Sequence, residues 1–132
     1  MSQINNNMLK TLCHPEILER YKKLSKIENL LPWQNSCLSQ LSAPDYDENL
    51  IFSAPTSAGK TLVAEILMQY SLIQRNEKVI FLVPIISTGE EKVEHFKKIF
   101  GRLSEKEIRV ESYLGNRYQN SGLRKGNIAV CT

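Results

Sequence analysis

The sequence has few cysteines, and they are not arranged as a metal site or a disulfide framework would require. Cys13, Cys37 and Cys131 are odd in number and widely spaced, no C-x-x-C pair occurs, and His14 and His95 are far apart. Both kinds of site need clustered or paired ligands. We therefore expect reduced thiols in or near the core and no structural zinc.

Long hydrophobic runs are missing as well. No run approaches the ~20 apolar residues of a membrane span. The stretch 1–10 is rich in asparagine and lacks the apolar centre of a signal peptide. These two absences predict a cytosolic or nuclear chain with no membrane partner. At 132 residues, with 42% hydrophobic and 23% charged residues, the chain is one globular domain at most. A net charge of +3 permits a nucleic-acid partner without arguing for one.

One stretch has the features of a phosphate-binding loop, and the rest of the chain is organised around it. It is SAPTSAGKT, residues 53–61, preceded by the apolar run 50–52 and followed by a helical pattern over 62–73. Strand, tight loop and helix form the context in which such a loop is credible. A glycine turn that merely precedes Lys-Thr is the alternative, and the agreement of all three elements disfavours it.

The residues of this loop suit a bound nucleoside triphosphate and Mg²⁺. Gly59 permits the sharp turn that brings main-chain N–H groups close to a phosphate, and the helix start adds its positive end. Lys60 would reach the β- and γ-phosphates, and the Thr61 hydroxyl would bind Mg²⁺. Ala54 stands where the general pattern has its first glycine. The predicted ATP-binding residues of the loop are Ala54, Pro55, Thr56, Ser57, Ala58, Gly59, Lys60 and Thr61.

The remaining pattern alternates short strands with helices. Proline at 15 and at 32 predicts helix starts, giving helices over 15–26 and 32–41. Two more helices are expected, one over 60–75 that stops at Asn76 and one capped by Ser87 that stops at Gly101. We expect strands at 49–53, 78–83, 109–114 and 127–131. The continuous apolar run 78–83 is typical of a central strand buried on both faces.

Alternating strands and helices indicate an α/β fold with a parallel sheet and right-handed crossovers. We expect a disordered tail over 1–12, N-terminal helices over 13–48, and a nucleotide-binding lobe over 49–132. Ligands of such sheets bind at the carboxyl ends of the strands. The loops after all four strands should therefore open on one rim of the sheet.

At this point the sequence resembles a known family. Residues 54–65, APTSAGKTLVAE, resemble the first motif of superfamily 2 helicases, and in particular the group of the DNA polymerase theta helicase domain and helicase Q. Four further segments match that group in order. They are the segment 17–34 that ends in Trp-Gln, motif Ia at 83–92, a glycine motif at 113–116 and the start of motif Ib at 128–132. Gly89 and Asn116 are small departures.

The resemblance implies a P-loop, RecA-like lobe that uses ATP and Mg²⁺ and tracks single-stranded or partly duplex DNA in the nucleus, in DNA repair. It implies that Gln34 reads the adenine edge, whereas without it a solvent-facing glutamine would be the simpler interpretation. Trp33 would pack beside the base or in the core. The implied nucleic-acid contacts are Pro84, Ser87, Lys92, Gly115, Asn116 and Thr132. The basic loop with Arg117, Arg124 and Lys125 is more simply an exposed loop, and Lys92 has the alternative of a solvated helix charge.

One part of a nucleotide motor is missing from these 132 residues. No aspartate follows Asp47, and the pair Asp47-Glu48 precedes the first expected strand, whereas catalysis needs carboxylates after a later one. We therefore expect an incomplete first motor lobe without the second RecA-like lobe, as a fragment, a truncated gene model or a short isoform. The alternatives left open are a non-catalytic nucleotide- or nucleic-acid-binding module, an RNA helicase of the same superfamily and, more weakly, another P-loop enzyme such as a small kinase.

Overall fold

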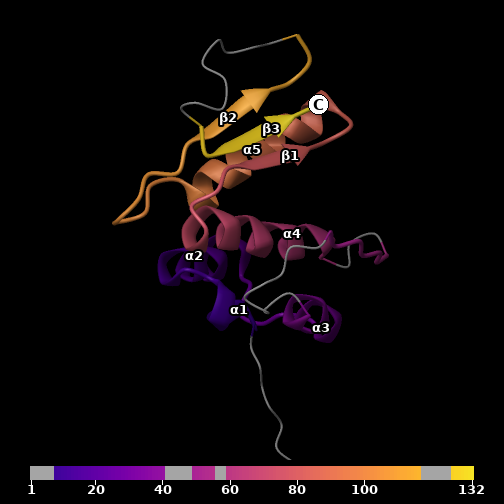
Figure 1. Ribbon diagram of the computed structural model, residues 1–132, viewed down its shortest axis with the longest axis vertical. Helices are drawn as coiled ribbons and strands as arrows, with labels where there is room; N and C mark the ends of the chain where they lie inside the picture. Colours follow the sequence, from indigo (N-terminus) through magenta and orange to yellow (C-terminus); the bar gives the residue numbers. More distant parts are fainter. Residues whose placement is uncertain (1–7, 41–48, 56–58, 117–125) are drawn as a thin grey trace, which may run out of the picture. The chain divides into compact units, whose positions relative to one another are not determined.

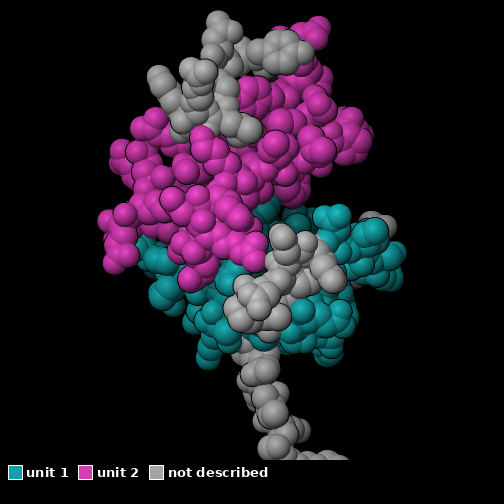
Figure 2. Space-filling model, in the orientation of Figure 1, with its two compact units in different colours: residues 1–70 teal, residues 71–132 magenta. Residues whose placement is uncertain are grey.

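The computed structural model describes residues 8–40, 49–55, 59–116 and 126–132. The chain forms two compact units, residues 1–70 and residues 71–132, which Figure 2 colours teal and magenta. Unit 1 contains the helix that follows Gly59, and unit 2 contains the parallel sheet.

Unit 1 is built from helices, labelled in Figure 1. They are α1 (Met8–Leu12), α2 (Pro15–Arg20) with its π-helical continuation η1 (Tyr21–Ser25), α3 (Pro32–Ser39) and α4 (Lys60–Gln69). Pro15 and Pro32 both occupy a first helical position, where a fixed φ helps and the missing N–H costs nothing. The two predicted N-terminal helices are thereby confirmed. The first of them ends at Lys26, whose φ of 52° is left-handed.

The core of unit 1 draws on every one of these helices. Met8 and Leu9 of α1 are buried, so the prediction of a disordered tail over 1–12 is wrong for residues 8–12. Two apolar side chains with a place in the core are enough to hold a five-residue helix that has little stability of its own. Residues 1–7 lie outside the described part. The other large buried side chains of the unit are Ile17, Tyr21, Leu38, Leu62, Val63 and Ile66.

The predicted strand at 49–53 is wrong. Its described residues, and those up to Pro55, form no strand, and the Ile51 side chain is 94% exposed. An apolar run becomes a strand only when a neighbour accepts and donates its ladder hydrogen bonds, and none of the three described strands pairs with this segment. Phe52 instead packs against Trp33, with 6.1 Å between the ring centroids.

Unit 2 contains a three-stranded parallel sheet, as Figure 1 shows. Its strands are β1 (Val79–Leu82), β2 (Val110–Tyr113) and β3 (Ile128–Cys131), in the spatial order β1-β3-β2. Residues Leu82, Cys131 and Tyr113 lie in register at the carboxyl ends of the three strands. The predicted mixed α/β fold with a parallel sheet is confirmed for these strands.

Helix α5 (Ile86–Phe100) packs on this sheet, with Phe96 against Phe81 of β1 at 5.0 Å in an edge-to-face contact. Strand β1 is an edge strand of the described sheet, and its Ile80 and Leu82 side chains are 57% and 74% exposed. The prediction that it is a central strand buried on both faces is therefore wrong. Strand β3 has that position, because the long connection after β2 returns the chain between its two predecessors.

The predicted start of α5 is wrong and its predicted end is confirmed. The helix cap is Ile85, and Ser87 lies inside the first turn, because the Gly89 N–H already bonds to the Ile85 carbonyl at 3.1 Å. The predicted Ser87 cap is thus wrong by two residues. Gly101 ends the helix as predicted, and Asn76, with φ of 52°, ends the π-helical turn η2 (Tyr70–Gln74) that continues α4.

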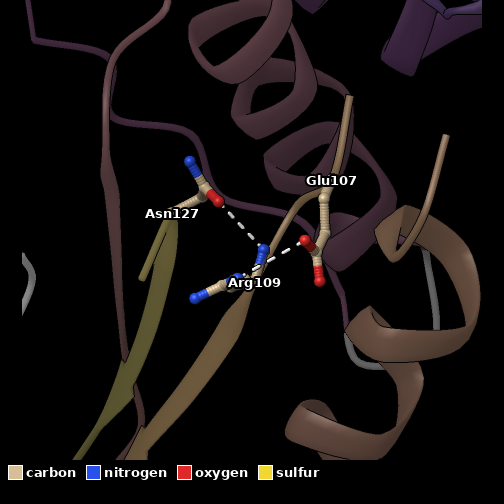
Figure 3. A network of polar contacts seen from close by, with 3 residues as sticks. All are labelled: Glu107, Arg109 and Asn127. Atoms are coloured by element: carbon tan, nitrogen blue, oxygen red, sulfur yellow. Dashed lines mark hydrogen bonds and ion pairs between the residues drawn. The ribbon is translucent and has the colours of Figure 1, made fainter. Parts of the chain in front are cut away.

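A polar network fixes the amino ends of β2 and β3 (Figure 3). The Asn127 side-chain oxygen accepts a hydrogen bond from the Arg109 main-chain N–H at 2.9 Å, and the Arg109 carbonyl accepts from the N–H groups of Asn127 and Ile128. Arg109 also forms an ion pair with Glu107 at 3.5 Å, between two side chains that are both more than half exposed. Such exposed pairs contribute little. The Asn127 bond therefore sets the register at this edge.

Candidate nucleotide site and nucleic-acid rim

The nucleotide site is built around the first turn of α4. Gly59 is the N-cap with φ of +84°, a left-handed conformation that glycine adopts without strain, and no side chain among the described residues caps the helix. The first N–H groups of a helix have no partner within it. Together with the helix dipole they form a positive end that suits a phosphate. Lys60 and Thr61 are the first two residues of this turn.

Gln34 is the residue that ties this turn to the preceding helix. Its side chain is 3% exposed, so the solvent-facing interpretation is wrong. The amide nitrogen donates to the Gly59 carbonyl at 2.9 Å, and the amide oxygen accepts from the Leu31 N–H at 2.8 Å. A Cβ added to Gly59 would lie 2.4 Å from this amide nitrogen. Adenine recognition by Gln34 stays a prediction, for which the amide has a second N–H donor and a second acceptor lone pair.

The residues in this turn fit a triphosphate with Mg²⁺. Lys60 is exposed and forms no ion pair with any residue in the described ranges, so its charge is available to an anion. Thr61 supplies one hydroxyl, which is enough because Mg²⁺ takes most of its ligands from phosphates and water. Ala54 is half-buried and Pro55 is exposed. The predicted loop residues Thr56, Ser57 and Ala58 lie outside the described residues.

The other end of α4 contains a second buried amide, which the sequence analysis missed. Gln69 is fully buried and accepts a hydrogen bond from the His14 N–H at 3.0 Å. Its nitrogen donates to the Cys13 sulfur at 2.9 Å. Glu65, one turn earlier, is also buried. Two polar residues at i and i+4 within the apolar stripe of a helix were the available signal.

Burial changes the acidity of the groups around Gln69. Burial raises the pKa of the Cys13 thiol to about 11. The Gln69 hydrogen bond lowers this pKa in part, and the nearby Glu65 raises it further. Burial also raises the pKa of Tyr21 well above its usual value, with Glu65 adding to the effect. The Tyr21 hydroxyl has no hydrogen-bond partner among the residues that the structure describes. The Cys13 thiol and the Tyr21 hydroxyl therefore keep their protons near pH 7.

The predicted nucleic-acid residues belong to unit 2, and two of them, Gly115 and Thr132, follow the carboxyl ends of β2 and β3. The Gly115 N–H donates to the Thr132 hydroxyl at 2.9 Å, which joins the segments that follow β2 and β3. Gly115 has φ of +60°, and a Cβ there would lie 2.8 Å from the Ile86 side chain at the start of α5. The rim therefore brings together Gly115, Thr132 and the first turn of α5.

The other predicted contacts differ in their exposure and in their position along the chain relative to Gly115 and Thr132. Pro84, Ser87 and Asn116 are exposed and flank the rim, since each follows the end of β1 or β2 by a few residues. Lys92 is half-buried and lies six residues into α5, about 9 Å along the helix from its start. Arg117, Arg124 and Lys125 lie outside the described residues.

Comparison with known proteins gives the family. A family model of DEAD/DEAH box helicases matches residues 31–132, which include α3, α4, the whole sheet and both candidate sites. The chain belongs to the DEAD/DEAH box helicase family. This family uses ATP, which agrees with the cap of α4 and with Lys60. The parallel sheet and its rim are thus part of a helicase domain of this family.

Individual relatives agree with this assignment. The chain is 37% identical over 116 residues to DNA polymerase theta of Drosophila melanogaster, covering 88% of this chain and 5% of that protein. It is 38% identical over 109 residues to a POLQ-like helicase of Caenorhabditis elegans, covering 80% and 11%. It is 40% identical over 83 residues to the ATP-dependent DNA helicase Hel308 of Thermococcus kodakarensis, covering 61% and 7%.

The resemblance predicted from the motifs is therefore confirmed, and a small kinase is excluded. The chain spans only 5–11% of the length of these three relatives. None of the helices in the described ranges is long and apolar enough to cross a membrane.

Proposed function

We propose that this chain is the ATP-binding part of an ATP-dependent DNA helicase. The observation that carries the proposal is the start of α4, where Gly59 is left-handed, no described side chain caps the first N–H groups and Lys60 is exposed. Such a helix start beside an exposed lysine suits a phosphate through dipole, N–H groups and charge together.

Within this proposal each residue of the site has one task. The first-turn N–H groups and Lys60 hold the β- and γ-phosphates, and Thr61 holds Mg²⁺, which neutralises charge on those phosphates. Gln34 recognises the adenine edge, because an amide offers the donor and the acceptor that adenine requires. Its hydrogen bond to the Gly59 carbonyl places the adenine-reading amide next to the proposed phosphate-binding turn.

The rim of unit 2 is the proposed contact for the tracked DNA strand, through Pro84, Ser87, Lys92, Gly115, Asn116 and Thr132. Main-chain groups and hydroxyls, which predominate there, bind phosphates without reading sequence, as a motor needs. The names of the relatives support DNA as the nucleic acid. The proposal adds a nuclear role in DNA repair, which the motif resemblance implies. An RNA helicase of the same superfamily is the nearest alternative.

A non-catalytic nucleotide- and DNA-binding module is the second candidate function. The observation that favours it is the lack of any aspartate after Asp47 in the sequence, which leaves the described strands of the sheet without the carboxylate pair that activates water. The two candidates share ATP binding at Lys60 and differ in ATP turnover.

Equilibrium binding of Mg·ATP to the whole chain tests the shared step. Lys60→Ala removes a charge-assisted contact, so we expect affinity to fall roughly ten- to a hundred-fold. Lys23→Ala, which removes an exposed lysine of η1, is the matched control and should bind as the wild type does. Equal affinities of the wild type and Lys60→Ala would contradict the proposal.

A further inference from the structure

Helix α4 is fixed at both ends by buried glutamine amides. At its start, Gln34 of α3 donates to the carbonyl of the N-cap Gly59. At its end, Gln69 of α4 itself accepts from His14 and donates to Cys13, at the junction of α1 and α2. The helix is ten residues long, so the two attachments are about 14 Å apart.

The attachment at Gln69 uses both functional groups of the side chain. The His14 N–H lies at the N-cap of α2, where main-chain donors lack helical partners, and Gln69 satisfies it. The Cys13 sulfur is a weak acceptor and keeps its proton because burial raises its pKa. A fully buried amide with both partners present is a specific arrangement, since losing either partner leaves a buried polar group unpaired.

Attachments at both ends of α4 restrict its rotation and its tilt as well as its position. A single attachment leaves a helix free to rotate about its axis and to tilt, whereas a second one removes both freedoms. The direction in which the exposed Lys60 side chain leaves the helix depends on that rotation. Apolar contacts from Leu62, Val63 and Ile66 hold the helix in the core but specify its rotation less sharply than directional hydrogen bonds do.

We propose that Gln69 is a positioning residue for phosphate binding, which orients the Lys60 side chain by holding the far end of α4 at the junction of Cys13 and His14. The inference rests on the proposed ATP site and adds to it the N-terminal helices α1 and α2 as part of the nucleotide-binding unit. Gln69 itself is far from the phosphates and acts only through the helix.

A double-mutant cycle on the whole chain tests this role. The dissociation constant of Mg·ATP is measured for the wild type, Lys60→Ala, Gln69→Leu and the double variant, at a temperature where circular dichroism shows all four folded. We expect Gln69→Leu to weaken binding roughly two- to thirty-fold. In the Lys60→Ala background the same substitution should change the dissociation constant less than about two-fold, because the group it aims is gone.

The outcomes separate positioning from simple stabilisation. If Gln69 only stabilises the fold, Gln69→Leu lowers the melting temperature but either binds Mg·ATP as the wild type does or weakens binding by the same factor with and without Lys60→Ala. Either result would overturn the inference. Gln74→Leu, an exposed glutamine five residues later, is the matched control and should bind as the wild type does. If Gln69→Leu does not fold, Cys13→Ala replaces it in the cycle, since it removes the acceptor of the Gln69 amide.

The cycle also separates this inference from the proposed function. If Lys60→Ala binds ATP as tightly as the wild type, the ATP site itself is wrong and Gln69 has nothing to position. If Lys60→Ala weakens binding and both Gln69→Leu and Cys13→Ala leave it unchanged, only the positioning role is wrong.

Discussion

The side-chain amide of Gln34 donates to the main-chain carbonyl of Gly59 over 2.9 Å, although 25 residues separate them in the sequence. The bond joins the first turn of α3 to the N-cap of the helix that carries Lys60. A residue expected to read a base is therefore also a structural partner of the phosphate-binding turn, and its two roles can be separated by experiment.

Gln34→Ala should lower the preference for ATP over GTP and also destabilise the fold. The preference falls if the amide reads adenine, and stability falls by about 1–3 kcal/mol if the Gly59 carbonyl and the Leu31 N–H lose their buried partner. Competition binding with the two nucleotides and chemical denaturation measure the two effects. Gln40→Ala, at an exposed glutamine of the same segment, is the control. An unchanged nucleotide ratio would leave Gln34 with its structural role alone.

Gly59→Ala should destabilise the protein through two separable causes. A left-handed φ of +84° costs a residue with a Cβ about 1–2 kcal/mol, and the new Cβ also collides with the Gln34 amide. In the double variant with Gln34→Ala the collision disappears and the strain stays. Urea unfolding of the three variants should therefore give a double-variant loss smaller than the sum of the single losses. Strict additivity would show that the collision relaxes without cost.

Single-stranded DNA should bind weakly, without sequence preference and with strong dependence on salt. The rim residues offer main-chain groups and hydroxyls to phosphates, and neutralised phosphates release counterions. Fluorescence anisotropy with mixed-sequence and homopolymer strands at two or more salt concentrations checks this. Tight binding that survives raised salt, or a strong preference for one sequence, would contradict the proposed DNA contact.

Cys13 should be the least reactive thiol of the folded chain, because the thiolate is the nucleophile and burial raises the pKa of Cys13 to about 11. At pH 8, Cys37 and Cys131, which are half-buried, should react first with a thiol reagent, and Cys13 only after unfolding. Mass spectrometry of the labelled chain identifies the order. Early labelling of Cys13 in the native protein would contradict its burial beside Gln69.

The same raised pKa fixes the sign of a pH effect on stability. Between the ordinary thiol pKa of 9.0 and the folded value of about 11, the folded state keeps a proton that the unfolded state has lost. Stability from this group is complete below pH 9 and declines as the pH rises to about 11. Urea unfolding of the wild type and Cys13→Ala at pH 8 and pH 10.5 should show a smaller alkaline loss in the variant.

The 132-residue chain alone should not hydrolyse ATP at a helicase rate. Lys60 and Thr61 would hold phosphates and Mg²⁺, but no aspartate follows Asp47 in these 132 residues to orient water. The expected source of an arginine for the γ-phosphate is a second RecA-like lobe, which the 132-residue chain does not include. An arginine finger alone is worth about 10³–10⁵ in rate in related chemistry. A phosphate-release assay with saturating single-stranded DNA checks this, with Lys60→Ala as the contamination control. DNA-stimulated release that is lost in Lys60→Ala would show that a catalytic carboxylate was misjudged.

The sequence by itself determined the short-range features of this protein. Pro15 and Pro32 each begin a helix, and Asn76, which is left-handed, and Gly101, which is extended, each follow the end of one. The sequence could place these boundaries because backbone sterics act within one or two residues. The ordered motifs identified the family, and the glycine before Lys60 marked the left-handed N-cap of α4. These signals need no knowledge of what lies across the core.

Tertiary structure decided whatever depends on a partner remote in the sequence. The apolar run 50–52 is unpaired among the described strands, and β3 is the central strand because it inserts between β1 and β2. Neither the resemblance, which singled out Gln34 for adenine, nor the helical pattern around Gln69 indicated their protein partners. Only the fold brings Gly59 and the Cys13–His14 junction to these two amides. Burial and hydrogen-bond satisfaction are properties of three-dimensional neighbourhoods, so periodicity could indicate that a residue faces the core but not which group it meets there.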